Sequence, residues 1–487
     1  MLFNSFEFLI FFFVVTLLYF ILPHKFRWFL LLIASCIFYM YAIPVYIVIL
    51  LFTIVIDYFA GIMIENAVGP TRKWFLVLSL VANIGILAFF KYYNFLAENL
   101  NLLLHIAAPA HNIPLLNIIL PIGLSFHTFQ AMSYTIEVYR GNHKAERHFG
   151  IYALYVMFYP QLVAGPIERP QNVLYQFHEK HKLEYNNLAV GIRLMLWGMI
   201  KKVVVADRLA LITDPIFDHP HNHTGVTLAI GAIFFAFQIY CDFSGYSDIA
   251  LGAARVMGFN LMVNFNHPYL ATTISDFWRR WHISLSTWFR DYLYISLGGN
   301  RVSFIRKNFN LFFVFLISGL WHGANWTFII WGALHGFYLV FASLTISVRQ
   351  KINDFIGLTK IPVLYKLSQQ MITFVLVTLA WVFFRANTVK DAGSILYAMH
   401  TIPEELLGVI KTHRLTGLHL PSLIAIIYGV LLIIVLQLAS IIEVRYNFSQ
   451  NFSSKPAVFR WSIYYLVLFI LFYWGVYDQH RFIYFQF

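Results

Sequence analysis

The chain has 487 residues, of which 60% are hydrophobic and 11% are charged, and its mean hydropathy is +0.69. A water-soluble domain needs a polar surface, so this composition excludes that class and predicts a protein that lies in a lipid bilayer. The net charge of +12 comes from basic residues in short loops between apolar runs. That pattern indicates cytoplasmic loops and contact with anionic membrane lipid rather than nucleic acid.

Apolar runs recur along the chain and predict an all-α polytopic membrane protein with about eleven transmembrane helices. Several runs are short, so we expect some helices to be re-entrant or interfacial. No internal repeat is visible, and we predict one membrane domain over residues 1–487, with N-terminal helices (1–150), a core (151–346) and C-terminal helices (347–487). The expected membrane segments are Phe6–Leu22, Phe26–Ala42, Val45–Ile64, Trp74–Phe90, Leu116–Val138, Tyr152–Ala164, Leu188–Val205, Thr227–Phe243, Leu311–Trp321, Thr327–Ile346, Met371–Phe384, Leu423–Ile442 and Ile463–Val476.

Basic residues occur at every second junction of the first segments, at positions 24–27, 72–73 and 140–147, whereas the junction at 42–45 has no charge. Because positive loops stay in the cytoplasm, the N-terminus is predicted to lie outside. The stretch from Tyr246 to Asn310 is too polar to span but rich in Trp, Phe, Tyr and Arg. We expect it to lie at the cytoplasmic interface.

Metal chemistry is not favoured. Cys36 and Cys241 both lie within apolar segments, and two cysteines make neither a disulfide framework nor a zinc motif. His219, His221 and His223 alternate in a way that invites a metal, but an exposed outer loop is the simpler interpretation. We therefore predict no metal site.

Two histidines stand out because polar groups within apolar runs are costly unless they serve a cavity or a partner. His322 lies between two predicted spans in Ser318–Trp326, beside Trp321 and Gly323 and close to Asn325. It is either a catalytic base or a hydrogen bond donor in helix packing.

The second histidine, His282, follows Trp281 in the run Trp278–Ser284. The neighbouring Arg279 and Arg280 suit a phosphate-bearing acyl donor, or alternatively anchor the chain at the membrane interface.

Asp242 and Asp248 lie beside small residues at the end of the predicted span Thr227–Phe243. Two interpretations remain open for them. They either form a polar cavity wall that orients a histidine, or they have a structural role, with Asp242 or Ser244 as a helix N-cap.

The order of these motifs resembles a known family. Residues 121–130 (PIGLSFHTFQ), 160–167 (PQLVAGPI), 242–248, 277–300 and 318–323 (SGLWHG) occur in sequence. Together they are similar to the membrane-bound O-acyltransferase family, in its bacterial alginate O-acetylase branch. The related D-alanyl transfer protein of teichoic acid synthesis and the peptidoglycan O-acetylase share much of the pattern, and the resemblance runs from about Asn4 to Phe487.

The resemblance implies a funnel of helices with a central tunnel in the bacterial inner membrane, and residues 151–346 as the catalytic core. It implies that His322 is catalytic and that His282 is a second essential residue nearer the donor. It also implies that acetyl is drawn from acetyl-CoA with no bound cofactor. A periplasmic acetyltransferase of the SGNH type would complete the transfer to a polysaccharide such as alginate.

In the same branch, endings such as residues 481–487 resemble an acyl-accepting tail centred on a tyrosine, here Tyr484. A phenol has a pKa of about 10 and a thiol one of about 8.5, so a phenyl ester keeps most of a thioester's transfer potential. An aromatic membrane anchor is the alternative for this tail. For the whole chain, the alternatives are the same chemistry on peptidoglycan, or a proton-coupled transporter or flippase.

Overall fold

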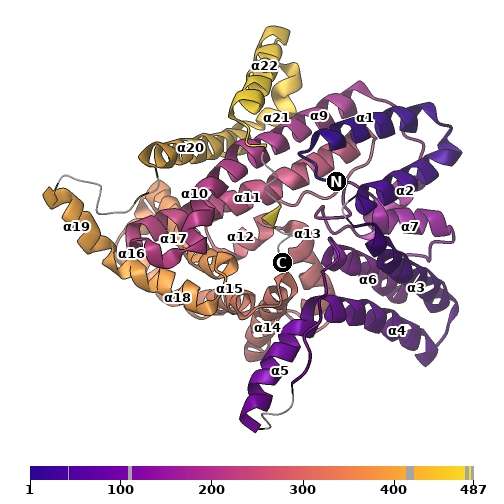
Figure 1. Ribbon diagram of the computed structural model, residues 1–487, viewed down its shortest axis with the longest axis horizontal. Helices are drawn as coiled ribbons and strands as arrows, with labels where there is room; N and C mark the ends of the chain where they lie inside the picture. The colour runs from indigo at the N-terminus through magenta and orange to yellow at the C-terminus, as the bar shows by residue number, and fades with distance from the viewer. Residues whose placement is uncertain (42, 108–111, 413–419, 421, 478–481, 484–487) are drawn as a thin grey trace. The chain divides into compact units, whose positions relative to one another are not determined.

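The computed structural model describes residues 1–41, 43–107, 112–412, 420, 422–477 and 482–483. Within these ranges the regular structure is helical and contains no strand, which confirms the predicted all-α class. The chain forms two compact units (Figure 1). The first contains residues 1–197 and 246–263, and the second contains residues 198–245 and 264–483.

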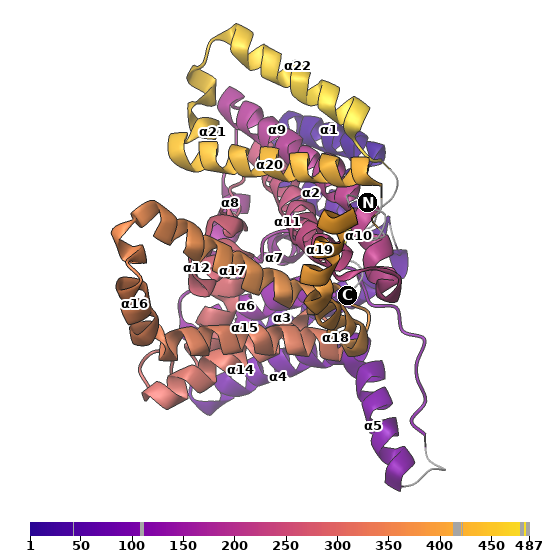
Figure 2. The same cartoon turned by 90° about the vertical axis from the view of Figure 1, so that its left-hand side faces the viewer.

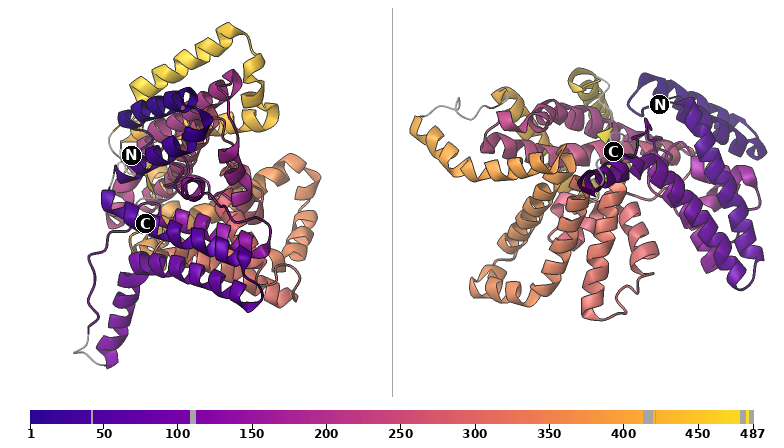
Figure 3. Two further views of the ribbon diagram at one scale, coloured as in Figure 1. Left: turned by 90° about the vertical axis from the view of Figure 1, so that its right-hand side faces the viewer. Right: turned by 60° about the horizontal axis from the view of Figure 1, so that its bottom comes forward.

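Short connections join most helices of the first unit. Its N-terminal helices, in indigo and purple, are seen from two further sides in Figure 3. Helices α3, α4 and α6 contact one another, and α2 packs on α7. The main helices are α1 (Phe6–Ile21), α2 (His24–Met40), α3 (Ile47–Asn66), α4 (Pro70–Leu87), α5 (Tyr93–Ala107), α6 (Leu124–Arg140), α7 (Phe149–Met157), α8 (Pro170–His178) and α9 (Tyr185–Met199), the last of which ends in the second unit.

The second unit contains the motifs of His282 and His322 and is built around a helical hairpin, α14 with α15, seen side by side in Figure 2. Its elements are η3 (Ile200–Ala206), α10 (Asp207–Asp218), α11 (Gly225–Val256, of which residues 246–256 belong to the first unit), α12 (Ile274–Arg280), α13 (Ile283–Trp288), η6 (Phe289–Tyr294), α14 (Phe304–His322), α15 (Trp326–Leu344), α16 (Ile346–Phe355), α17 (Pro362–Arg385), α18 (Val389–Ala398), α19 (Ile402–Thr412), α20 (Leu423–Tyr446), α21 (Phe448–Asn451) and α22 (Ala457–Trp474).

In the described residues, seven helical segments are long and apolar enough to cross a membrane, and α1 is a shorter apolar helix. The expected count of about eleven stays a prediction. The seven segments are Pro44–Asn66, Pro70–His105, Gly225–Val256, Trp326–Leu344, Pro362–Arg385, Leu423–Tyr446 and Ala457–Trp474.

Two expected segments have different limits. The run predicted as Leu116–Val138 is helical only from Leu124, because Gly123 has φ of +78° and breaks the helix there. The helix expected to end at Phe243 continues as α11 to Val256, so Asp242 and Ser244 lie inside a 32-residue helix. The N-cap interpretation of these two residues is therefore wrong.

Glycines determine how closely α14 and α15 approach each other. A Cβ atom on Gly332 would collide with the carbonyl oxygen of Phe315 and lie 3.1 Å from the nitrogen of Gly319. A Cβ on Gly319 would in turn collide with the carbonyl of Phe328. In an apolar medium, such small-residue contacts are a main source of helix association.

We predict that Gly332→Ala lowers stability by about 1–3 kcal/mol, because the added methyl group must push the two backbones apart. Gly393→Ala is the matched control, since nothing lies within 4 Å of its Cβ position in α18. Thermal unfolding of the detergent-purified variants, followed by size-exclusion chromatography, measures the difference. Equal unfolding midpoints for the two variants would contradict the close contact.

Candidate active site

His322 is the last residue of α14 and is 5% exposed. Its imidazole packs edge-on against three aromatic rings. The ring centroids lie 4.9 Å from Trp331, 5.0 Å from Trp321 and 5.4 Å from Phe384. Gly323 follows in extended conformation, and a Cβ at that position would collide with the ring of Phe328. The helix end therefore turns sharply and leaves the histidine at the junction of α14 and α15.

His282 lies between α12 and α13 and is fully buried. Its φ of +44° places it in the left-handed region, which costs a non-glycine residue about 1–3 kcal/mol. Neighbouring hydrogen bonds hold this conformation. The side-chain oxygen of Asn264 accepts from the hydroxyl of Ser284 at 2.7 Å, and its carbonyl accepts from the Ile283 amide at 2.9 Å. The strained backbone is thus held by the segment that precedes α12.

The two histidines converge on one indole. The ring centroid of Trp321 lies 6.4 Å from that of His282 and 5.0 Å from that of His322. Phe243 of α11 covers the other side of His282 at 4.6 Å. The structure therefore brings together two residues that are 40 positions apart in the sequence, in surroundings built from aromatic rings.

Burial lowers the pKa of His282 to about 3. The group lies outside the candidate membrane spans. An imidazole with this pKa is neutral throughout the physiological range, and a neutral imidazole is the form that accepts a proton.

A third buried histidine, His335 of α15, was not singled out from the sequence. The indole N–H of Trp278 donates to its Nδ1 at 3.2 Å, and its ring lies 5.0 Å from that of Trp331. His335 has no arginine near it in the sequence, and its apolar segment does not distinguish it from a histidine that serves helix packing. Its contact with Trp331, which also packs on His322, connects it with the site.

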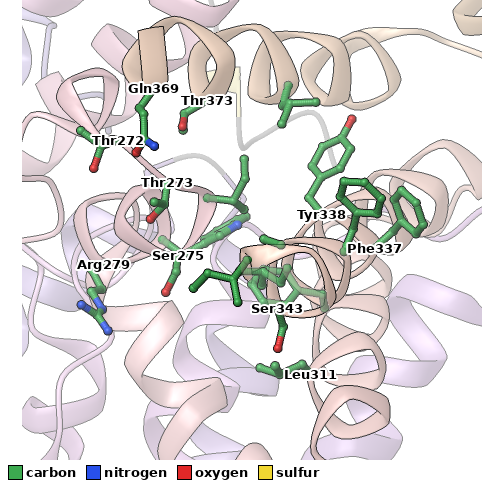
Figure 4. Close-up of a pocket in the computed structure, with 18 of the residues that line it drawn as sticks. Thr272, Thr273, Ser275, Arg279, Leu311, Phe337, Tyr338, Ser343, Gln369 and Thr373 are labelled. Atoms are coloured by element: carbon green, nitrogen blue, oxygen red, sulfur yellow. The ribbon is translucent and has the colours of Figure 1, made fainter. Parts of the chain in front are cut away.

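A cavity of about 1280 Å³ lies beside the aromatic cluster within the second unit (Figure 4). It reaches Ser318, which precedes His322 by about one helical turn, and Trp278, whose ring lies 5.7 Å from that of Trp331. Figure 4 shows Arg279, Tyr338 and Gln369 around it.

The charges in the cavity wall all have one sign. Among the described residues, the charged ones that line it are Arg279, Arg290, Lys307 and Arg349. They come from four different elements, α12, η6, α14 and α16. The rest of the wall is apolar or neutral, including Thr273, Ser275 and Asn300. A positive, partly apolar cavity suits a molecule that combines phosphate groups with an uncharged arm.

The remaining predicted site residues fall in three places. Arg280 does not line the cavity, and its Nε pairs with Asp276 at 2.9 Å. Trp281 is buried and packs on Trp381 at 5.0 Å. Asn325 is the N-cap of α15, where its Oδ1 accepts from the Thr327 amide at 3.0 Å.

The two acids differ from each other. Asp242 lies in the second unit and binds Lys202 at 2.6 Å, whereas Asp248 lies in the first unit, further along α11. Tyr484 lies outside the described residues. Its assignment, like the roles of the other site residues, stays a prediction.

The chain is a helical protein with several apolar spans, and its second unit contains two buried histidines and a cationic cavity, as a membrane-embedded enzyme would need. The family model of the membrane-bound O-acyltransferases matches residues 147–382, a range that contains both histidines and the cavity. The chain belongs to the membrane-bound O-acyltransferase family and is a multi-pass O-acyltransferase. Family membership decides against the transporter or flippase alternative.

Among relatives of known name, the chain is 40% identical to the probable alginate O-acetylase AlgI of Pseudomonas aeruginosa, over 87% of this chain and 79% of the relative. It is 38% identical to the peptidoglycan O-acetyltransferase of Helicobacter pylori, over 76% and 73% of the two chains. It is 28% identical to the teichoic acid D-alanyltransferase of Bacillus subtilis, over 45% and 58%. The resemblance expected from the motifs is confirmed.

We predict that His322→Ala and His282→Asn each lower acyl transfer by about 10²–10⁴-fold, the usual effect of losing a general base. Asparagine is chosen at position 282 because it tolerates the left-handed backbone. Transfer is measured together with the amount of folded protein, and the exposed His219→Ala is the control. Normal transfer at normal abundance by either variant would remove that histidine from the catalytic site.

Proposed function

We propose that this enzyme takes an acetyl group from cytoplasmic acetyl-CoA and passes it across the bacterial inner membrane for O-acetylation of an extracytoplasmic polysaccharide of the alginate type. The cationic cavity beside the histidine pair carries this proposal. Acetyl-CoA combines phosphate groups with an uncharged pantetheine arm, and the cavity offers four cations at positions that are separated by apolar wall. The relatives named as O-acetylases support acetyl as the group that is transferred.

In the proposed reaction, the thioester enters the cavity past Arg279 with its phosphates near the cations, and Arg280 supports the entrance from outside the cavity. Neutral imidazole of His322, assisted by His282, removes the proton from the accepting hydroxyl group. The resulting oxygen attacks the thioester carbonyl, the carbon–sulfur bond breaks, and the thiolate leaves with the proton from the imidazole. Trp281, Trp321, Asp248 and Asn325 are proposed as lining or supporting residues.

Tyr484 is proposed as the first acceptor. The acetyl group would travel on its phenol oxygen through a tunnel, and a periplasmic SGNH-type acetyltransferase would then transfer it to the polysaccharide. Such an ester retains most of the transfer potential of the thioester, because a phenolate is almost as good a leaving group as a thiolate.

Peptidoglycan is the second candidate acceptor, which the Helicobacter pylori relative favours. Both acceptors lie outside the inner membrane, so the chemistry of the donor side is the same for both. Comparing the O-acetyl content of purified peptidoglycan and of exopolysaccharide in a deletion strain distinguishes them.

The first prediction of this proposal concerns Tyr484. With acetyl-CoA labelled in the acetyl group, the wild-type peptide that contains Tyr484 is expected to gain about 42 Da, the mass of one acetyl in place of a proton. Tyr484→Phe keeps the ring and loses only the oxygen, so transfer should fall close to zero although the protein stays folded. The idea is wrong if the Phe variant transfers normally or if the labelled peptide is never found.

The second prediction concerns the membrane orientation, with the N-terminus outside and the 277–300 stretch in the cytoplasm. Arg301→Cys places a thiol in the exposed loop before α14 without removing the Ser303 cap of that helix. It should react with impermeant reagents only after the inner face is opened. Asn222→Cys, exposed before α11, is the opposite control and should react in intact cells. Labelling of Arg301→Cys in intact cells would reverse the donor side.

A further inference from the structure

A buried ion cluster lies in the second unit, away from the cavity. The ammonium group of Lys202 in η3 binds Asp207 at 2.8 Å and Asp242 at 2.6 Å. All three side chains are at most 7% exposed. Placing one ammonium and two carboxylates in a buried position is expensive, and replacing such a group by apolar residues is often neutral or stabilising. The cluster therefore calls for an explanation other than stability.

The second oxygen of Asp242 provides one. Its Oδ2 accepts a buried hydrogen bond of 2.8 Å from the backbone amide of Ile483. Oδ1 of the same carboxylate is used by Lys202, so both oxygens are engaged, one by an ammonium and one by the C-terminal segment. Phe482 and Ile483 are both buried, at 2% and 7% exposure.

The residues at the end of α22, which precede Phe482 and Ile483 in the sequence, are also attached near Lys202. The amide of Val476 donates to the carbonyl of Val203 in η3 at 2.9 Å, and Arg208 donates to the carbonyl of Trp474 at 2.7 Å. The end of α22 is thus attached to η3 and α10 independently of Asp242. The contact at Ile483 is a second, separate attachment beyond it.

This second attachment lies close to His282. The ring of Phe482 lies 5.7 Å from that of Phe243, and Phe243 packs on His282 at 4.6 Å. Phe243 directly follows Asp242 in α11. One turn of α11 therefore contacts both the backbone and a side chain of the C-terminal segment, and also one histidine of the site.

We propose that Lys202 and Asp242 form a latch that holds the backbone of Ile483, and that this attachment of the C-terminal segment is required for the acyl transfer proposed for Tyr484. The proposal rests on the acyl-carrier role of Tyr484 given above. Lys202 and Asp242 are positioning residues. Lys202 donates to Oδ1 of Asp242 and the Ile483 amide donates to Oδ2, so the loss of one carboxylate oxygen disturbs both contacts.

Asp242→Asn tests the latch because an amide has one acceptor oxygen where the carboxylate has two. Either Lys202 or the Ile483 amide then faces an NH₂ group, and two donors do not pair. We expect hydrogen exchange at the peptide containing Ile483 to become at least tenfold faster, and acetylation of Tyr484 to become at least tenfold slower. Peptides of α14 and α15 should exchange as in the wild-type protein, which a general loss of structure would not allow.

Asp207→Asn is the matched control for exchange, since it removes a charge from the same lysine but has no described contact with Ile483, and it should retain the protection. If Asp242→Asn does not fold, Ile483→Pro answers the question, because proline removes the amide proton and leaves the ion cluster intact. Rapid exchange of Ile483 in the wild-type protein, or wild-type acetylation of Tyr484 by Ile483→Pro, would overturn the latch. If Tyr484→Phe transfers normally while Asp242→Asn still loses the exchange protection, the carrier role fails and the docking contact stands.

Discussion

The contact between α14 and α15 is the one on which the site depends most. Two helices in an apolar medium gain little from hydrophobic burial, so their association relies on close packing of the backbones. Gly319 and Gly332 make this packing possible, since neither has room for a methyl group. The contact brings Trp331 of α15 against His322 at the end of α14. Trp321, the residue before His322, in turn packs near the ring of His282.

Several buried polar groups of the second unit have specific partners. Asn264 stabilises the left-handed backbone at His282, and Trp278 donates to His335. Lys202 is shared between two carboxylates. Each of these arrangements satisfies a group that would otherwise cost several kcal/mol in an apolar surrounding.

In the proposed reaction, the donor and the acceptor are held by different elements of the second unit. The cations that would hold a phosphate-bearing donor come from α12, η6, α14 and α16. The groups that would hold the acceptor segment come from η3 and α11. His282 contacts Phe243 on the acceptor side and Trp321 on the side of His322. In the proposed reaction, His282 therefore lies between the segment that would carry the acceptor and the histidine that would act as the base.

The sequence alone determined the class of this protein and predicted which histidines are reactive. A 60% hydrophobic chain has to place its backbone in helices within a bilayer, because unpaired backbone groups are too costly there. Five ordered motifs, two of which contain His282 and His322, indicated the family, because each motif is local and can be recognised within its own segment.

Tertiary structure decided what depends on contacts between distant segments. Arg279 and Arg280 look equivalent in the sequence, but successive helix positions are about 100° apart, so one lines the cavity and the other pairs with Asp276. The length of α11 was misjudged because small and polar residues near Ser244 resemble a helix end. The proposed role of Asp242 could not be predicted from the sequence, because it depends on residues far away in the chain. Its partners, Lys202 and Ile483, lie 40 and 241 positions away. The residues around an acid in an apolar helix do not indicate which distant group it will bind.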